Sequence, residues 1–224
     1  MKETEIRALV SLIEDEDYEV FNHVRDKIRS LGSDAIPFLE NEWETNFNPD
    51  VQKRIEDLVH DMQFVQLKER FSQWVDTETD DLLKGLWILA TYQYPDLEIE
   101  ELESQINELY EGIKNEFVEG LAPIDYVRLV NKHLFDKVKF RANTKNFHSP
   151  GNSMINIVLE SKKGSPITMC AVYMLITQKL NLPIYGVNLP NLFILTYQTD
   201  ELPFYINVFN KGLIFTKTDI DNYL

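Results

Sequence analysis

The chain has one cysteine, eight glycines and no long apolar run among its 224 residues. Its only cysteine, Cys170, excludes an intrachain disulfide and favours a reducing compartment. Eight scattered glycines exclude a glycine-rich phosphate-binding loop. The longest apolar stretch lies around Cys170 and is far shorter than the ~20 residues that span a bilayer. Because the N-terminal stretch ETEIRALVSLIEDED also lacks the apolar core of a signal peptide, the sequence predicts a cytoplasmic protein.

Histidine is scarce as well, with four residues in the chain: His23, His60, His133 and His148. No Cys/His spacing fits a zinc site, so we expect neither a metal nor a cofactor. We interpret His133, in VNKHLF, as a half-buried surface residue of an amphipathic helix. His148 falls in the loop NFHSP, close in sequence to the candidate site described below.

The net charge of -15 is unevenly distributed. Residues 1–120 contain 11 Lys and Arg against 30 Asp and Glu, a net charge of -19, whereas residues 121–224 contain 11 against 7, a net charge of +4. An acidic half repels nucleic acid and anionic membranes, which argues against both as partners. The acidic surface either keeps the protein soluble or docks a basic partner, which includes the chain's own basic half.

Apolar residues at helical spacing predict helices over the first ~75 residues. Gly32 is predicted to end a helix over YEVFNHVRDKIRSL, and Ser33 to cap the next one, DAIPFLENEWE. Asn48 followed by Pro49 predicts the start of a long helix. A short helix, a tight turn and a new helix resemble HEAT-type α-hairpins. The polar stretch VDTETDD then predicts a boundary between a helical segment, residues 1–76, and a second domain, residues 77–224.

A second motif, FHSPGNSMINIVLESKKGSPITM, begins at Phe147. Within it, Asn152 and Ser153 are predicted to cap a helix that runs through the following apolar residues. Ser165 is predicted to cap the next helix, with Pro166 at its first position. That helix, PITMCAVYMLITQKL, is apolar almost all round, so it should be the buried central helix. The alternating stretches LPIYGVNL and NLFILTYQ then predict two strands.

This motif resembles the pattern YxxPxNSxLxxVLxxRxGxPIxL of the SirB-type bacterial regulator family. The stretch LWILATYQYPDLEIEEL resembles the opening helices of the same domain, so the resemblance covers about two-thirds of the chain. It implies a transglutaminase-like, papain-like ground plan with a nucleophile at a helix start and strands that carry a His and an acidic partner. The ending LIFTKTDIDNYL predicts the start of a further helix, and the longer family members imply a C-terminal part beyond it.

The resemblance also implies that the three catalytic positions hold the wrong residues. The nucleophile position falls between Pro166 and Thr168, where there is no cysteine. Leu192 occupies the His position and Asn207 the Asp position, and neither can act as a proton shuttle or stabilise an imidazolium. Cys170 lies about one turn deeper among apolar residues, where burial raises a thiol pKa, so we interpret it as structural.

Two groups of residues remain as candidate binding sites. A residual cleft would hydrogen-bond a peptide or amide, although the same residues can simply cap turns. Its predicted members are His148, Asn152, Thr168, Cys170, Asn188, Asn191 and Asn207. A basic strip would hold an anion or, as we favour, dock against the chain's own acidic helices. Its members are Lys137, Lys139, Arg141, Lys145, Lys162 and Lys163.

The sequence thus predicts an α+β protein: a helical N-terminal segment, then a transglutaminase-like domain with a small antiparallel sheet packed on a central helix. The missing triad favours a pseudoenzyme that binds a protein or peptide. The alternative is an amide hydrolase or acyltransferase with a rearranged site built on Cys170 or Thr168 and His148.

Overall fold

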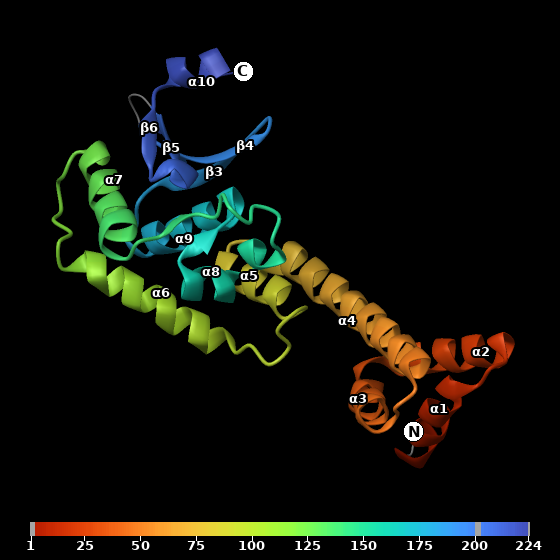
Figure 1. Cartoon of the computed structure of the whole chain (residues 1–224). Coiled ribbons are helices and arrows are strands. Elements are labelled where there is room, and N and C mark those ends of the chain that lie inside the picture. Colours follow the sequence, from red (N-terminus) through yellow and green to blue (C-terminus); the bar gives the residue numbers. More distant parts are fainter. Residues whose placement is uncertain (1–2, 200–202, 224) are drawn as a thin grey trace. The chain divides into compact units, whose positions relative to one another are not determined.

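The computed structural model describes residues 3–199 and 203–223 and divides the chain into two compact units, Met1–Thr77 and Glu78–Leu224 (Figure 1). Each unit has its own apolar core. The described residues form mostly helices, with the strands confined to the second unit.

The first unit is all helical, as predicted. Its α-helices are α1 (Glu3–Ser11), α2 (Tyr18–Arg29), α3 (Ile36–Thr45) and α4 (Pro49–Thr77), with short 3-10 turns η1 (Leu12–Glu14) and η2 (Gly32–Ala35). The predicted start of α4 is confirmed, because the Asn48 side chain accepts a hydrogen bond from the amide of Asp50 at 3.0 Å. The predicted Ser33 cap is wrong: Ser33 lies inside η2, and α3 begins only after this turn.

The second unit combines helices with a four-stranded sheet. Its first part contains α5 (Leu82–Ala90), α6 (Ile99–Lys114), α7 (Pro123–Asn131), the π-helical turn η3 (Lys132–Lys137), β1 (Arg141–Ala142), η4 (Pro150–Ser153) and α8 (Ile155–Ser161). Then follow β2 (Lys163–Gly164), α9 (Pro166–Lys179), β3 (Ile184–Leu189), β4 (Leu192–Tyr197), β5 (Phe204–Asn207), η5 (Val208–Asn210), β6 (Leu213–Phe215) and α10 (Lys217–Tyr223).

The sheet has the antiparallel order β3-β4-β5-β6, and its first hairpin pairs Leu189 with Leu192 across a two-residue turn. Both strands of this hairpin were predicted. A separate two-stranded ladder joins β1 and β2 in parallel. The predicted caps at Asn152 and Ser153 are wrong, because both residues lie in η4 and α8 begins after Met154 without a side-chain cap.

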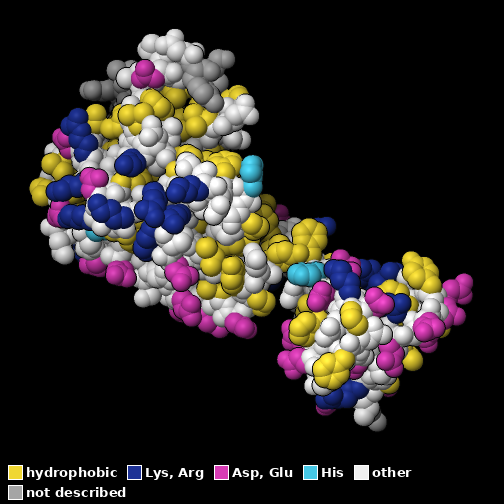
Figure 2. Space-filling model, in the orientation of Figure 1, with side chains coloured by type: hydrophobic (Ala, Val, Ile, Leu, Met, Phe, Trp, Pro, Cys, Tyr) yellow, Lys and Arg dark blue, Asp and Glu magenta, His cyan; other side chains and the backbone are white. Residues whose placement is uncertain are grey.

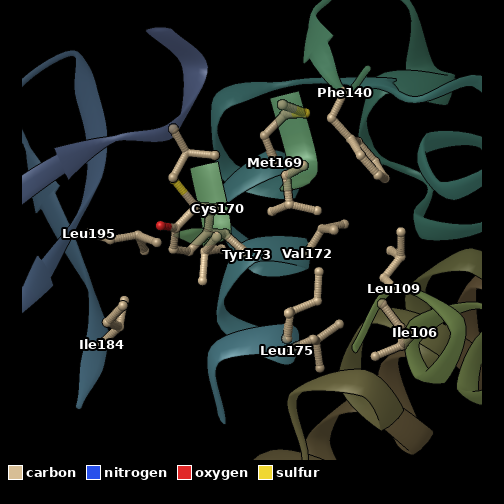
Figure 3. Packing of buried hydrophobic residues seen from close by; sticks show 14 of the residues in the cluster. Ile106, Leu109, Phe140, Met169, Cys170, Val172, Tyr173, Leu175, Ile184 and Leu195 are labelled. Carbon is tan, nitrogen blue, oxygen red and sulfur yellow. The ribbon is translucent and has the colours of Figure 1, made fainter. Parts of the chain in front are cut away.

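Helix α9 is the central helix, as predicted. Figure 3 shows it with Ile184 and Leu195 of the sheet on one side and Ile106 and Leu109 of α6 on the other. Most of its side chains are buried, because apolar residues occur around the whole helix and each face meets a different element. The predicted small antiparallel sheet packed on a central helix is therefore confirmed.

Candidate functional site

The N-terminal end of α9 is built by a helix cap that the sequence predicts. Ser165 is the cap: its Oγ accepts a hydrogen bond from the amide of Thr168 at 3.3 Å and lies 3.0 Å from Thr168 Oγ1. Pro166 occupies the first helical position, as predicted. Such a helix end carries partial positive charge and would stabilise a thiolate. Proline and threonine occupy it here, and the threonine hydroxyl is already engaged with the capping serine.

Cys170 lies deeper in α9 and is fully buried in the apolar core (Figure 3). Its Sγ lies 3.8 Å from the carbonyl oxygen of Phe193 in β4. Burial raises the pKa of the Cys170 thiol to about 12, although a backbone hydrogen bond from Val208 opposes this in part. At neutral pH the group is therefore a protonated, weakly polar core side chain.

Leu192 and Asn207 are the residues that the family resemblance predicts at the other two triad positions. Leu192 is the first residue of β4, directly after the hairpin turn. Asn207 ends β5, and its side-chain oxygen accepts a hydrogen bond from the amide of Asn210 at 3.1 Å. Its carbonyl also accepts one from the amide of Gly212 at 2.9 Å. Asn207 thus closes the turn between β5 and β6.

Asn152 is buried and holds the loop before α8 in place. Its Nδ2 donates to the carbonyl oxygens of Asn146 at 2.7 Å and Phe147 at 2.9 Å, and its Oδ1 accepts from Asn143 at 2.7 Å. Its own carbonyl accepts from the amide of Ser165, which ties this loop to the start of α9. Every polar atom of the side chain is used within the fold.

The other cleft candidates lie on exposed surface. Asn188 and Asn191 are at the end of the β3–β4 hairpin, where Asn191 takes a left-handed φ of 57°. His148 is exposed, with its ring edge-on to Phe147 at 5.2 Å between centroids. Within the described part of the chain, His148 makes no hydrogen bond to Cys170 or Thr168. The geometry therefore contains no assembled nucleophile–base pair among these residues.

The model of the transglutaminase-like superfamily matches residues 100–224, more than half of the chain. The chain belongs to the transglutaminase-like superfamily. It is 29% identical over 139 residues to a UPF0162 protein of Xylella fastidiosa and 26% identical over 106 residues to one of Pasteurella multocida. These matches cover 62% and 47% of the chain, but only 49% and 40% of the two relatives.

A shorter match, 30% identical over 91 residues, joins the chain to F-box only protein 21 of Mus musculus and covers 37% of the chain and 14% of that protein. No solved structure matches the chain. The chain spans about half the length of the Xylella relative that it matches. The matched residues 100–224 include all the positions at which the sequence predicts a degenerate triad.

Two exposed apolar side chains of the transglutaminase-like unit, Ile167 and Phe147, were not predicted from the sequence. Ile167, in the first turn of α9, is 61% exposed, although the helix was expected to be buried all round. Phe147 is 46% exposed and meets Phe209 of η5 edge-on at 6.2 Å between ring centroids. The first turn of a helix often extends past the core that covers its middle, and this was the available signal for Ile167.

The basic strip of the transglutaminase-like unit is only partly brought together by defined contacts. Arg141 and Lys163 are partners in the β1–β2 ladder, and the amide of Arg141 donates to the carbonyl of Lys162 at 2.9 Å. Lys137 instead forms an ion pair with Glu116, which lowers the pKa of that carboxyl group. Within the basic strip, Lys137 is therefore paired with Glu116, whereas Arg141, Lys162 and Lys163 lie at the β1–β2 ladder.

Two pockets of the transglutaminase-like unit lie elsewhere. One, of about 470 Å³, is lined by α5, α6 and the end of α9, and the other, of about 420 Å³, by residues of β3, β4 and β5. None of the candidate cleft residues lines either pocket. Over residues 3–199 and 203–223, no cluster of His, Cys, Asp and Glu suits a metal ion, and no helix has the length and apolar content to cross a membrane.

Proposed function

We propose that this transglutaminase-like protein is a non-catalytic, SirB-type module that binds a protein or peptide partner. The observation that carries the proposal is the burial of Cys170, whose thiol pKa is raised to about 12. A nucleophile must be ionised or be next to a base, and Leu192 occupies the position from which the His would act. The scaffold is thus retained without the groups that make it an enzyme.

The surface that we assign to the partner is centred on Phe147 and Ile167. Ile167 is exposed in the first turn of α9, and Phe147 is exposed in the loop that Asn152 ties to the start of that helix. Both side chains are large enough to fill pockets on a partner. The polar candidates are less suitable, because Asn152 and Asn207 are engaged with backbone groups of their own loops. Binding would bury the apolar pair without any bond being made or broken.

The alternative function is an amide hydrolase or acyltransferase with a rearranged nucleophile. One observation favours it: two hydroxyl groups, those of Ser165 and Thr168, lie 3.0 Å apart at the positive end of α9. A base that accepts the proton is still needed, and His148 would have to move to supply it.

Alkylation of Cys170 with iodoacetamide, between about pH 5 and 9, tests the proposal that the protein is non-catalytic. We expect slow labelling of the native protein and fast labelling after unfolding, measured by intact mass. Fast labelling of the native protein with a midpoint below that of a free thiol would overturn the proposal. Hydrolysis or transamidation of glutamine peptides that is lost in Thr168→Val would establish the alternative.

Peptide selection tests the binding surface. A random peptide library is selected on the full chain, and the recovered peptides are measured against Ile167→Asp and Val118→Asp. Val118, in the loop after α6, is a matched control, because its exposed fraction of 62% is close to the 61% of Ile167. We expect binding to be lost in Ile167→Asp and Phe147→Ser and retained in Val118→Asp; equal binding to all of them refutes the assigned surface.

We also propose that α1–α4 form HEAT-like hairpins, that residues 1–76 and 77–224 fold as separate domains, and that the protein is cytoplasmic. The separate apolar cores of the two compact units support the domain division. Expression of residues 77–224 alone tests it: a cooperative thermal transition is expected, and a molten or aggregated product contradicts the division.

A further inference from the structure

A cationic face lies on the second unit around the β1–β2 ladder, and Figure 2 shows Lys and Arg side chains gathered there. The ladder sets Arg141 beside Lys163, and Lys162 extends over the ring of Phe140 at 5.1 Å. Since β1 also contacts η5, Lys211 directly after that turn belongs to the same region. We define the cationic face as Lys139, Arg141, Lys145, Lys162, Lys163 and Lys211.

Most of these cations have no ion pair within their own unit. Among the described residues of the second unit, no carboxylate oxygen lies within 4.0 Å of Lys139, Arg141, Lys145, Lys163 or Lys211. Residues 121–224 carry a net charge of +4, so the cations of this part of the chain outnumber the carboxylates that could pair with them. By contrast, the neighbouring Lys132 and Lys137 both pair with Glu116.

Three lysines of this face also adopt an unfavourable backbone conformation. Lys139, Lys162 and Lys211 have φ values of 70°, 57° and 53°. Glycine adopts this left-handed region without steric cost, whereas a lysine is strained there. Of the five described non-glycine residues with positive φ, three are therefore lysines of one surface. Lys162 and Lys211 take this conformation at the C-caps of α8 and η5, where glycine is the usual residue. Strained residues of this kind occur often at ligand sites.

The charge around the face limits the shape of its ligand. Helix α6 presents a run of exposed glutamates, which include Glu103, Glu108 and Glu111, and Figure 2 shows an acidic margin along the same face of the unit. A long polyanion such as nucleic acid that extends from the cations onto this margin would be repelled. A short acidic segment can remain on the cations alone.

We propose that this cationic face binds a short acidic segment of a partner protein. The unpaired cations attract its carboxylates, and the three strained lysines hold ammonium groups at positions that a relaxed backbone would not give. This surface consists of different residues from the apolar pair Phe147 and Ile167. An experiment can therefore refute either proposal without refuting the other.

Binding of a fluorescent oligo-glutamate peptide to the full chain, followed by anisotropy at low and at physiological salt, tests the proposal. We expect binding that weakens as salt rises, because exposed charges are screened. The variant Lys139→Gly, Arg141→Gln, Lys163→Gln, Lys211→Gly should bind roughly tenfold more weakly. Glycine suits the two left-handed positions, so this variant should unfold at a midpoint no lower than that of the wild type, which separates lost binding from lost folding.

A matched variant, Lys179→Gln with Lys217→Gln, removes two exposed lysines outside the face and should bind like the wild type. An oligodeoxynucleotide of equal charge is the competing probe. Absence of peptide binding at low salt, an unchanged affinity in the face variant, or tighter binding of the oligonucleotide than of the peptide would each overturn the proposal. The last outcome would indicate a nucleic-acid surface instead.

Discussion

The imidazole ring of His133 lies directly against Gly112. A Cβ atom on Gly112 would stand 2.4 Å from Cε1 and 2.8 Å from Nε2 of that ring. The sequence pattern predicts a half-buried surface residue, and that prediction is wrong, since His133 is only 9% exposed. The missing side chain at position 112 and the π-helical turn that begins at Lys132 together make room for the ring.

Gly112→Ala is therefore expected to destabilise the protein by about 2 kcal/mol, because the buried ring must move to admit the new methyl group. An alanine in a helix that met no obstacle would instead stabilise it by up to about 1 kcal/mol. Urea unfolding measures the difference. The double variant Gly112→Ala, His133→Ala should lose less than the sum of the single changes; strict additivity would contradict the contact.

The fold should become less stable as pH decreases, because His133 takes up a proton. Burial lowers its pKa, Lys137 lowers it further, and Glu116 opposes both. Because the folded pKa lies below the ordinary 6.5, the unfolded chain takes up the proton first as pH falls. The stability from the neutral ring is complete above 6.5 and is lost as pH falls through the folded value.

Urea midpoints between about pH 7.5 and 5.5 measure this effect. We expect the wild type to lose more stability over this range than His133→Gln does. His148→Gln is the control, since that ring is exposed, and it should follow the wild type. Parallel curves for the wild type and His133→Gln would exclude the titration of His133 as the cause.

Asn152→Ala should cost about 2–3 kcal/mol, because it leaves the carbonyl groups of Asn146 and Phe147 without their donor. Asn152→Asp should cost at least as much, since a carboxylate would face two carbonyl oxygens. Asn188→Ala, at an exposed strand position, should change stability by less than about 0.5 kcal/mol. Thermal unfolding compares the three, and a stable Asn152→Asp variant would show that the amide donors are dispensable.

Asn207→Asp places a carboxyl group at the predicted acidic position and should be tolerated within about 0.5 kcal/mol, because a carboxylate oxygen also accepts the hydrogen bond from Asn210. Asn207→Leu removes the acceptor and should cost about 1 kcal/mol. Chemical denaturation ranks the two variants. Hydrolysis or transamidation of a glutamine peptide by the wild type that is lost in Asn207→Leu would overturn the non-catalytic proposal.

Gly212→Ala should be strongly destabilising, by about 3 kcal/mol, because its Cβ would meet Asn131 Oδ1 at 2.0 Å and its φ is +73°. Asn131 cannot easily move, as it donates to the carbonyl of Gly212 and accepts from Tyr173. Gly120→Ala is the control: it has φ +84° but open space around it, so it reports backbone strain of about 1 kcal/mol alone. Equal losses in the two variants would show that the contact with Asn131 is unimportant.

Local signals predicted the elements that surround the site. The serine cap and proline at the start of α9, the Asn-Pro start of α4 and the alternating strands β3 and β4 all follow from bonds or periodicity within a few residues. Where a 3-10 turn came first, as at Ser33 and Asn152, the same reasoning placed the helix start too early. Capping residues predict where a helical turn begins. They do not show whether that first turn is 3-10 or α-helical.

Contacts between distant segments were not predictable from one sequence. The fit of His133 against Gly112 depends on how α6 packs on η3, and the exposure of Ile167 depends on where the core ends along α9. The hydrogen bonds of Asn152 and Asn207 are local, but whether an amide points into a cleft or back to its loop is set by the folded backbone. Resemblance to a family predicts which residue stands at a given position, whereas its hydrogen-bond partners are known only from the folded structure.

Cys170 is the only sulfhydryl of the chain, and it lies in the core of just one of the two units. Its rate of reaction under native conditions reports how often that core opens, whatever happens in residues 3–77. Far-ultraviolet circular dichroism, in contrast, is sensitive to the helices of both units. Together, the two signals distinguish a chain that melts in one step from one whose halves melt in succession.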